Sequence, residues 1–237
     1  MKIQKFDIQK GIYEFKLDEM KTEFHSHPAY EIVFSKSGGI DLETKNRRYK
    51  DVSLAIIAPN HAHKIEFKKP EVLVLMIECS TKHFENTVAG YGIVLSGGVY
   101  ADNKTEERKE NVKEIFSVIC SSTESITADA RVRKCLQYLN GSPADYKMIM
   151  KELKAETCFS DSRLSHLLKA EIGISIKKYF VWSKLKRAFE KVVRGEANMY
   201  EASIEYEFYD QAHLSKTFKK MLGINPSGVY NSRMLQV

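Results

Sequence analysis

The sequence is poor in cysteine, proline and glycine, and it lacks a long apolar run. Its 237 residues include 4 cysteines, 5 prolines and 12 glycines. The cysteines are scattered without the C-x-x-C spacing of metal and redox sites, which favours reduced, structural thiols and a cytoplasmic protein. No stretch approaches the roughly 20 apolar residues of a membrane span, and no basic-then-apolar leader opens the chain. We therefore expect no membrane partner.

The sequence does have an excess of positive charge, and this excess lies in one half of the chain. The formal net charge is +6 over a length that suffices for two modest domains. Residues 1–127 carry 18 Lys+Arg and 19 Asp+Glu, whereas residues 128–237 carry 19 and 12, so the two net charges are −1 and +7. A basic half of this kind favours a domain that binds nucleic acid.

One short segment of the basic half occurs twice, fifty positions apart. Residues 164–174 (LSHLLKAEIGI) realign onto residues 214–224 (LSKTFKKMLGI), with 5 of the 11 pairs identical. Two copies are too few for a solenoid, which needs three or more repeats. Two copies of a small helical unit in a basic region instead favour a protein that holds a long polyanion at two places.

The first hundred residues have the pattern of short strands. Runs rich in β-branched and aromatic residues are separated by turn signals such as Ser37-Gly38-Gly39 and Pro59-Asn60. Short strands at this spacing predict a small barrel or a double-sheet sandwich. The strands that we predict cover residues 30–34, 53–58, 72–78 and 92–95.

The rest of the chain has helical patterns. Residues 104–121 place Val112, Ile115, Phe116 and Ile119 at helical spacing, as in a helix that packs on its own domain or on a second copy. Residues 121–127 are polar and suit a linker. Further helices are predicted over residues 128–140, 146–156, 162–172, 177–194, 199–207 and 211–222, with a short last helix starting at Asn225-Pro226.

The four helices around the repeat form two pairs of helix-turn-helix size. The repeated helix turns Leu164, Leu167 and Leu168 inward in the first unit, and Leu214 and Phe218 in the second. Short polar groups near the start of such a helix, with a lysine further on, suit base contacts followed by a phosphate contact. The residues left facing outward are Ser162, Arg163, Ser165, His166 and Lys169 in the first unit and Gln211, Ala212, His213, Ser215, Lys216 and Lys219 in the second.

Residues 151–230 resemble the C-terminal DNA-binding domain of AraC/XylS-type transcription regulators. The first unit has LSxLLKxExGIS over residues 164–175, and the second has the more specific FYDQxHLSKTFKKxxGIxP over residues 208–226. The resemblance implies two helix-turn-helix units joined by a long helix, with their second helices in adjacent major grooves of promoter DNA, roughly 34 Å apart. It also implies a homodimer and leaves RNA polymerase open as a further partner.

The chain departs from this family in the turns between the paired helices. Cys158 and Glu207 stand where the family usually has glycine, which adopts a left-handed backbone freely. The second turn is also one residue longer than the first. A Glu207 close to the duplex would repel phosphate, so the second unit is the less secure of the two. Among base contacts, Gln211 toward adenine is our first prediction.

A second motif lies in the strand-rich half. His25, His27 and Glu31 form H-x-H-x3-E-x6-G with Gly38, and His63 follows within a Pro-Asn-His-Ala-His segment. This pair of motifs is similar to the cupin barrel, whose enzymes bind a divalent metal. The resemblance implies His25, His27, Glu31 and His63 as metal ligands, a donor set that suits zinc, iron, nickel or manganese.

Alternatives stay open for these residues. Sensor domains of AraC-type regulators also resemble cupins and use such residues, without metal, to line a pocket for a small-molecule effector. On that interpretation, which we favour, the protein is not an enzyme. The competing hypotheses are a metal-dependent cupin oxygenase or isomerase with an appended helical domain, and a regulator that responds to partner proteins or pH. The pocket residues are His25, His27, Glu31, His61 and His63.

We therefore predict an α+β multidomain chain with three parts. Residues 1–102 form a cupin-like β-barrel that senses an effector. Residues 103–127 form a dimerisation helix and a linker. Residues 128–237 form an all-α DNA-binding domain of two helix-turn-helix units joined by a long helix.

Overall fold

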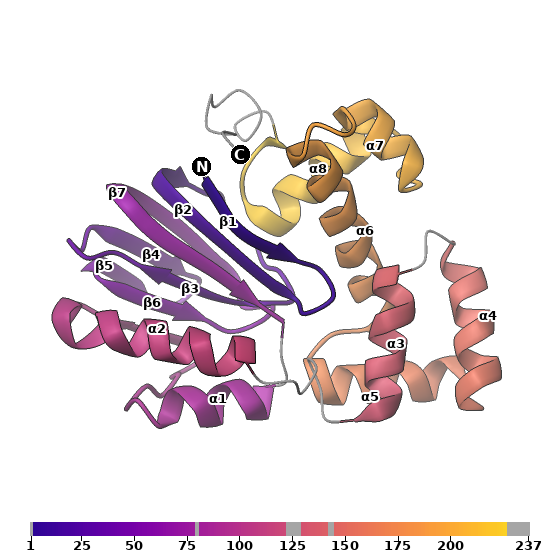
Figure 1. Cartoon of the computed structure of the whole chain (residues 1–237), viewed down its shortest axis with the longest axis horizontal. Helices are drawn as coiled ribbons and strands as arrows, with labels where there is room; N and C mark the ends of the chain where they lie inside the picture. The colour runs from indigo at the N-terminus through magenta and orange to yellow at the C-terminus, as the bar shows by residue number, and fades with distance from the viewer. Residues whose placement is uncertain (1, 79–80, 122–128, 142–144, 227–237) are drawn as a thin grey trace.

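The computed structural model of the chain describes residues 2–78, 81–121, 129–141 and 145–226. An antiparallel sheet with two helices on its outer side comes first, and a helical domain packs beside it (Figure 1). This confirms the predicted α+β order of a strand-rich part followed by a helical part.

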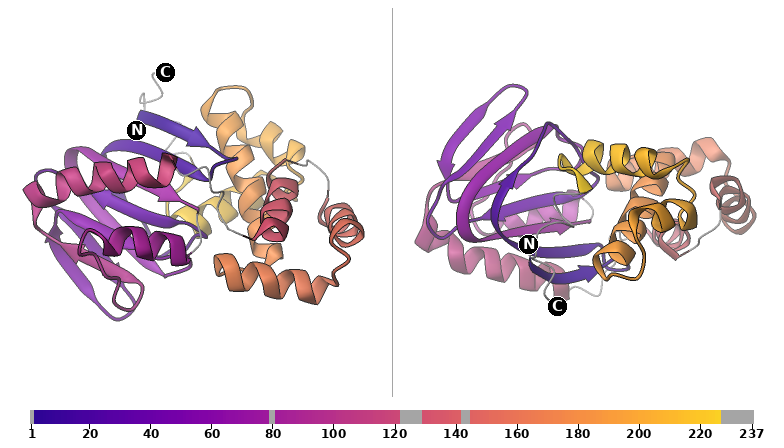
Figure 2. Two further views of the ribbon diagram at one scale, coloured as in Figure 1. Left: turned by 60° about the horizontal axis from the view of Figure 1, so that its bottom comes forward. Right: turned by 90° about the horizontal axis from the view of Figure 1, so that it is seen from above.

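The sheet of the described residues has eight strands in the order β1-β2-β7-β3-β6-β8, and β4 pairs with both β5 and β7. The long strand β7 pairs with β2 along most of its length, and on its other edge it pairs first with β4 and then with β3, so the sheet curls around it (Figure 2). The strands are β1 (Lys2–Asp7), β2 (Ile12–Lys21), β3 (Tyr30–Phe34), β4 (Ile40–Thr44), β5 (Arg48–Val52), β6 (Leu54–Ile57), β7 (His63–Ile77) and β8 (Val99–Asp102).

The two-residue period of a strand assigns the side chains of β3 to two different cores. Tyr30, Ile32 and Phe34 lie in the core shared with the two outer helices. Val33 lies in the core that continues into the helical domain, and Glu31 is buried on the same side. The alternation therefore turns Glu31 toward the inside of the curled sheet.

Two helices, α1 (Thr81–Ala89) and α2 (Thr105–Ser121), cover the outer side of the sheet (Figure 1). Val112, Ile115 and Ile119 of α2 are buried in the same core as Phe84 of α1 and the outward side chains of β3. Most of the apolar stripe that we predicted for residues 104–121 thus packs on its own domain, one of its two predicted roles.

Several local predictions need correction. Residues 92–95 form no strand: Gly92 has a left-handed backbone, Ile93 alone is deeply buried and Val94 is 72% exposed, so the run follows neither strand alternation nor a ladder. Helix α1 was not predicted, although Phe84 and Val88 have helical spacing, and neither were β1, β2, β4, β5 and β8. The predicted linker falls on residues 122–127, and the predicted last helix mostly on residues after 226, which lie outside the described residues.

The helical domain follows the predicted order closely. The long helix α6 lies between the two helix pairs and also faces the sheet (Figures 1 and 2). None of the described helices is long and apolar enough to cross a bilayer. The helices are α3 (Ala130–Gly141), α4 (Tyr146–Thr157), α5 (Asp161–Ile172), α6 (Ile176–Val193), α7 (Met199–Glu205) and α8 (Gln211–Leu222).

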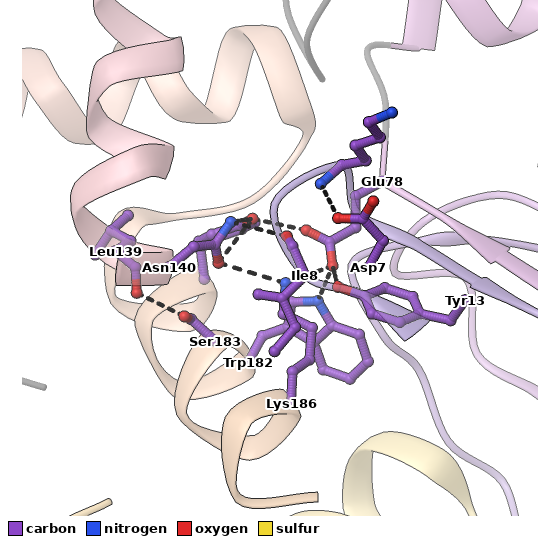
Figure 3. A network of polar contacts seen from close by, with 11 residues as sticks. Asp7, Ile8, Tyr13, Glu78, Leu139, Asn140, Trp182, Ser183 and Lys186 are labelled. Carbon is purple, nitrogen blue, oxygen red and sulfur yellow. Dashed lines mark hydrogen bonds and ion pairs between the residues drawn. The ribbon is translucent and has the colours of Figure 1, made fainter. Parts of the chain in front are cut away.

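A buried carboxylate joins the sheet to the helical domain. Glu78, directly after β7, accepts hydrogen bonds from the Tyr13 hydroxyl of β2 (2.8 Å) and, on α6, from the Tyr179 hydroxyl (2.6 Å) and the Trp182 indole N–H (2.8 Å). The Lys186 ammonium, also on α6, lies 2.6 Å from the same carboxylate (Figure 3). The three α6 residues lie on one face of the helix, so a single acid holds that face.

Helix α3 joins the same network from its last turn. The Asn140 amide donates to the Tyr179 hydroxyl (3.1 Å), and the Ser183 hydroxyl donates to the Leu139 carbonyl (2.6 Å) (Figure 3). Burial lowers the pKa of Lys186, whereas burial and the neighbouring Glu78 carboxylate raise the pKa of the Tyr179 hydroxyl well above its ordinary value. The network therefore contains the buried ion pair of Lys186 and Glu78. Both charges are removed from water, so each is stabilised by the other.

We expect Lys186→Met to destabilise the protein by about 3–5 kcal/mol, because it leaves the Glu78 carboxylate buried without its cation. The double variant Lys186→Met, Glu78→Gln removes both charges and should recover a large part of this loss. The matched control is Lys191→Met, whose partner Glu205 is exposed and whose loss should cost at most about 1 kcal/mol. Urea unfolding followed by circular dichroism measures all three; equal losses for Lys186→Met and Lys191→Met would contradict the buried-pair account.

Candidate nucleic-acid interface and effector pocket

The two helix pairs repeat at the level of individual capping residues. Helix α5 begins after the N-cap Ser160, and α8 begins after the N-cap Asp210, each accepting a backbone N–H three residues ahead. Both helices end at a left-handed glycine, Gly173 and Gly223. N-caps and C-caps are thus both fifty positions apart, as the repeat predicts.

The turns between the paired helices contain left-handed residues that are not glycine. Cys158 has φ 56° and Glu207 has φ 51°. They are forty-nine positions apart, whereas the following helices are fifty apart, which accounts for the extra residue in the second turn. The chain therefore retains the left-handed turn position that glycine usually fills, at a cost of about 1–2 kcal/mol for a residue with a Cβ.

The charge of Glu207 is partly neutralised within the helical domain. Its carbonyl accepts a hydrogen bond from the Lys184 ammonium of α6 (2.8 Å), and its carboxylate lies 3.8 Å from the same nitrogen. Half of the Glu207 side chain remains exposed. Its charge is therefore weaker toward a phosphate than the sequence alone indicates.

Each second helix presents a polar face with an apolar face beneath it. Leu164 and Leu168 of α5 and Leu214 and Phe218 of α8 are buried, while Leu167 is only partly buried. The predicted DNA-contacting residues that are exposed are Ser162, Arg163, His166, Lys169, Gln211, Ala212, His213 and Lys216, and those that are partly buried are Ser165, Ser215 and Lys219.

Two of the predicted contacts on α8 already have partners within the chain. The His213 ring accepts the Tyr209 backbone N–H (3.2 Å) and thereby holds the turn. Lys219 lies 2.6 Å from the Glu23 carboxylate of the strand-rich part. Tyr209 is 92% exposed immediately before the α8 N-cap, where sequence periodicity gave no reason to select it.

The histidine motif forms a compact buried cluster. One ligand atom from each of His25, His27, Glu31 and His63, together called the tetrad below, lies within 4.8 Å of the others. His27 Nε2 is 3.1 Å and His63 Nε2 is 2.8 Å from the same Glu31 oxygen. His61 is not part of this cluster: its ring lies against Gly98, and its backbone carbonyl pairs with the His63 ring (2.8 Å).

Backbone carbonyls fix the orientation of the tetrad histidines. Nδ1 of His25 lies 2.9 Å from the Glu23 carbonyl, Nδ1 of His27 lies 3.1 Å from the Ala29 carbonyl, and Nδ1 of His63 is paired in the same way. A carbonyl only accepts, so each Nδ1 donates and carries a proton. Each Nε2 is consequently the nitrogen that faces the interior of the tetrad.

The charges of the tetrad are coupled. Burial opposes ionisation of Glu31, but hydrogen bonds from His27 and His63 outweigh it and hold the pKa of Glu31 well below its ordinary value. Burial lowers the pKa of His63, but the Glu31 carboxylate outweighs burial and the pKa is raised. For His25, burial and the neighbouring His63 lower the pKa to about 4.

The donor set of the tetrad fits a divalent cation. Three imidazole nitrogens with one carboxylate oxygen suit zinc, iron, nickel or manganese, and carbonyl-bound Nδ1 atoms are the usual outer partners of metal-binding histidines. His25, His27, Glu31 and His63 would hold the ion, which when bound supplies a Lewis acid at the end of the neighbouring cavity.

A cavity of about 90 Å³ lies between the sheet and the helical domain. His25, His27 and Glu31 line one part of it, so the tetrad borders the space directly. Helices α6 and α8 line the other side, which means that the helical domain itself closes the pocket. The apolar lining includes Phe15, Val74 and Met76 from the sheet and Leu185, Phe189, Phe218 and Leu222 from the helices.

Comparisons with known proteins identify the helical part. Residues 153–232 match the family model described as "Helix-turn-helix domain". The arabinose operon regulatory proteins of Salmonella typhimurium and Escherichia coli are 33% identical to this chain over 101 residues, which is 42% of this chain and 35% and 34% of those proteins. The chain thus matches only about a third of the length of these curated relatives.

Solved structures of ToxT from Vibrio cholerae have the same fold over nearly the whole chain. One, bound to (E)-4-(8-methylnaphthalen-1-yl)but-3-enoic acid, is 14% identical with a TM-score of 0.53 and covers 95% of this chain and 98% of that one. Another, bound to an unsaturated fatty acid, is 14% identical with a TM-score of 0.50 and covers 92% and 93%. At this identity the likeness establishes the two-part fold alone.

The left-handed turn gives a stability prediction. We expect Cys158→Gly to stabilise the protein by about 1 kcal/mol, because glycine relieves the backbone strain at an exposed position where no packing is lost. The control Cys158→Ala removes the thiol and keeps the strained Cβ, so it should give no gain. Urea unfolding compares them, and an equal gain for alanine would assign the effect to the thiol.

The tetrad gives a binding prediction. We expect Co²⁺, used as a spectroscopic substitute, to produce a saturable visible absorption band that His63→Gln abolishes. His166→Gln, on the exposed face of α5, is the control and should leave the band intact. Metal analysis of the purified protein that detects no bound cation, together with no band in the wild type, would show that the tetrad is a hydrogen-bonded structural cluster.

Proposed function

We propose that this chain, whose C-terminal part is a helix-turn-helix domain of the AraC/XylS type, is a DNA-binding transcription regulator that responds to a small-molecule effector. The observation that carries the proposal is the pair of capped helical units fifty positions apart within the matched domain. A single helix with a solvated polar face is common and indicates no function. Two such helices within the basic half of the chain suit a protein that contacts one polyanion at two places.

The polar faces of α5 and α8 suit the major groove. On α8, Gln211 precedes Lys216 by more than one helical turn, which matches a base contact followed by a phosphate contact. Helix α6 connects the two units and sets their separation, and the grooves they would enter lie roughly 34 Å apart. Tyr209, exposed beside the α8 N-terminus, adds a further group able to contact a phosphate.

The strand-rich part supplies the sensor in this proposal. We assign residues 1–102 to effector sensing, residues 103–127 to a helix and linker that contribute to dimerisation, and residues 128–237 to DNA binding. The apolar cavity that borders the tetrad supports a small-molecule site, and the ToxT structures named above contain small organic acids. The arabinose operon regulators, similar over the DNA-binding part, support control of a promoter.

Further partners follow from this proposal. A regulator of this type acts on DNA as a homodimer in the cytoplasm and communicates with RNA polymerase. An enzymatic role for the tetrad is the weaker alternative, because it gives no function to the repeated helices. Turnover of a substrate that disappears in His27→Ala would favour that alternative.

DNA binding provides the direct test. We expect Lys216→Ala to weaken binding to promoter fragments several-fold and to reduce the slope of log K against log salt by about 0.9, the value for one phosphate contact. Lys36→Ala, in the turn after β3, makes the same charge change outside both the DNA-contacting helices and the helix assigned to dimerisation, and should have no effect. Mobility-shift titrations at several salt concentrations measure both, and equal losses for the two variants would contradict the assignment of α8.

A further inference from the structure

The charges around the interdomain cavity disfavour an anionic occupant. Lys186 lines the cavity, but its ammonium lies 2.6 Å from Glu78 and within 6 Å of the rings of Tyr179 and Trp182. At the tetrad end, the Glu31 carboxylate already pairs with Nε2 of His27 (3.1 Å) and Nε2 of His63 (2.8 Å). A ligand carboxylate would have to displace Glu78 from Lys186 or lie beside Glu31, and a buried charge without a partner is costly.

The volume of the cavity limits the size of the molecule that can bind without movement of the cavity walls. An engineered protein cavity of about 150 Å³ accepts benzene, whereas this one measures about 90 Å³. A molecule with a six-carbon chain or ring therefore needs one wall to move. Because residues of both domains line the cavity, we expect binding of such a molecule to be coupled to the arrangement of the two domains.

The wall formed by α8 is less firmly attached than the wall formed by the sheet. Strands β2 and β7 are joined by a long antiparallel ladder with one register shift between Leu17 and Glu19. The end of α8 meets the sensor through the Glu23 backbone N–H, which donates to the Gly223 carbonyl (2.7 Å), and through the exposed pair of Lys219 and Glu23 (2.6 Å). An exposed ion pair contributes at most about 1 kcal/mol.

The contact at Gly223 has no space for a side chain. A Cβ built at Gly223 would lie 2.5 Å from His25 Nδ1 and 2.7 Å from the Glu23 carbonyl oxygen. At the equivalent Gly173, a Cβ would meet only the Asn60 amide nitrogen at 4.0 Å. The glycine that ends the second helix therefore packs closely against the sensor only in the second of the two repeated units.

We propose that the cavity binds an uncharged, apolar molecule, and that this molecule acts as a wedge that separates the α8 end from the sensor. Separation breaks the contact of Gly223 with the segment between β2 and β3 that carries His25, and it releases Lys219 from Glu23. The wedge links occupancy of the cavity to the position of the second DNA-contacting helix. The effect of the wedge on DNA binding rests on the function proposed above. The binding of the apolar molecule and the separation of α8 from the sensor do not.

Trp182 reports on this movement directly, because it is the single tryptophan of the chain and lines the cavity. We expect 1-octanol to cause a saturable change in tryptophan emission and greater quenching by acrylamide. Octanoate, with the same chain length and a carboxylate, should bind at least about tenfold more weakly. The titration uses full-length protein stripped with EDTA, because a cation in the tetrad would itself attract octanoate.

Two results overturn the ligand class. If octanoate binds the stripped protein as tightly as octanol, the cavity accepts anions; if neither probe changes the emission, the cavity is not a ligand site. The location is tested with Val74→Phe, which fills the cavity from the sheet side and should weaken octanol binding. The control Val118→Phe makes the same change at an exposed position of α2. Equal octanol affinity in the two variants overturns the location.

The wedge is tested without ligand by Gly223→Ala. The added Cβ should force α8 away from the sensor and increase acrylamide quenching of Trp182. Gly173→Ala imposes the same left-handed strain at the end of α5 without the collision, so it should leave quenching unchanged. Equal quenching in the two variants overturns the wedge.

DNA binding is measured separately, so that the two proposals fail independently. Octanol and Gly223→Ala should change DNA affinity in the same direction, because both separate α8 from the sensor. Opposite changes overturn the wedge and leave the regulator intact. A protein that binds octanol as expected but never binds DNA overturns the proposed function and leaves the cavity site intact.

Discussion

The arrangement of the two domains depends on one buried carboxylate, that of Glu78. It accepts hydrogen bonds from Tyr13 on the sheet side and from Tyr179, Trp182 and Lys186 on α6. Because α6 also connects the two helix-turn-helix units, the acid that holds α6 fixes the position of both units relative to the sensor. The same contact fixes one wall of the cavity, so the size of the cavity follows from where α6 lies.

The features that sequence reasoning predicted are those with local causes. The end glycines Gly173 and Gly223 obey a rule that operates within one helical turn, so the repeat, which ends in Gly-Ile, located them correctly. The tetrad could also be predicted from the sequence, because alternation along β3 turns Glu31 inward and the loop before β3 brings His27 to the same side. In both cases the spacing of a few residues determines the contact.

The features that sequence reasoning missed have distant causes. Glu78 and Lys186 are 108 positions apart, and neither position differs in pattern from an ordinary strand end or helix lysine. The effector pocket was predicted from histidines of the strand-rich part alone, whereas α6 and α8 provide much of its apolar wall. His61 was included because it lies next to His63 in a motif, but its ring packs on Gly98 instead. Packing between domains decides these contacts, and no local periodicity encodes it.

The inequality of the two units follows from what surrounds them. Both end at a left-handed glycine, but the backbone of Gly223 bonds to Glu23 whereas Gly173 meets no part of the sensor so closely. Lys219 has the same dual position, since a lysine predicted to contact DNA also pairs with the sensor. A helix that must satisfy both a duplex and a sensor contact cannot be optimal for either. The repeat supplies two similar helices, and in our proposal the docking of α8 against the sensor makes the second helix the regulated one.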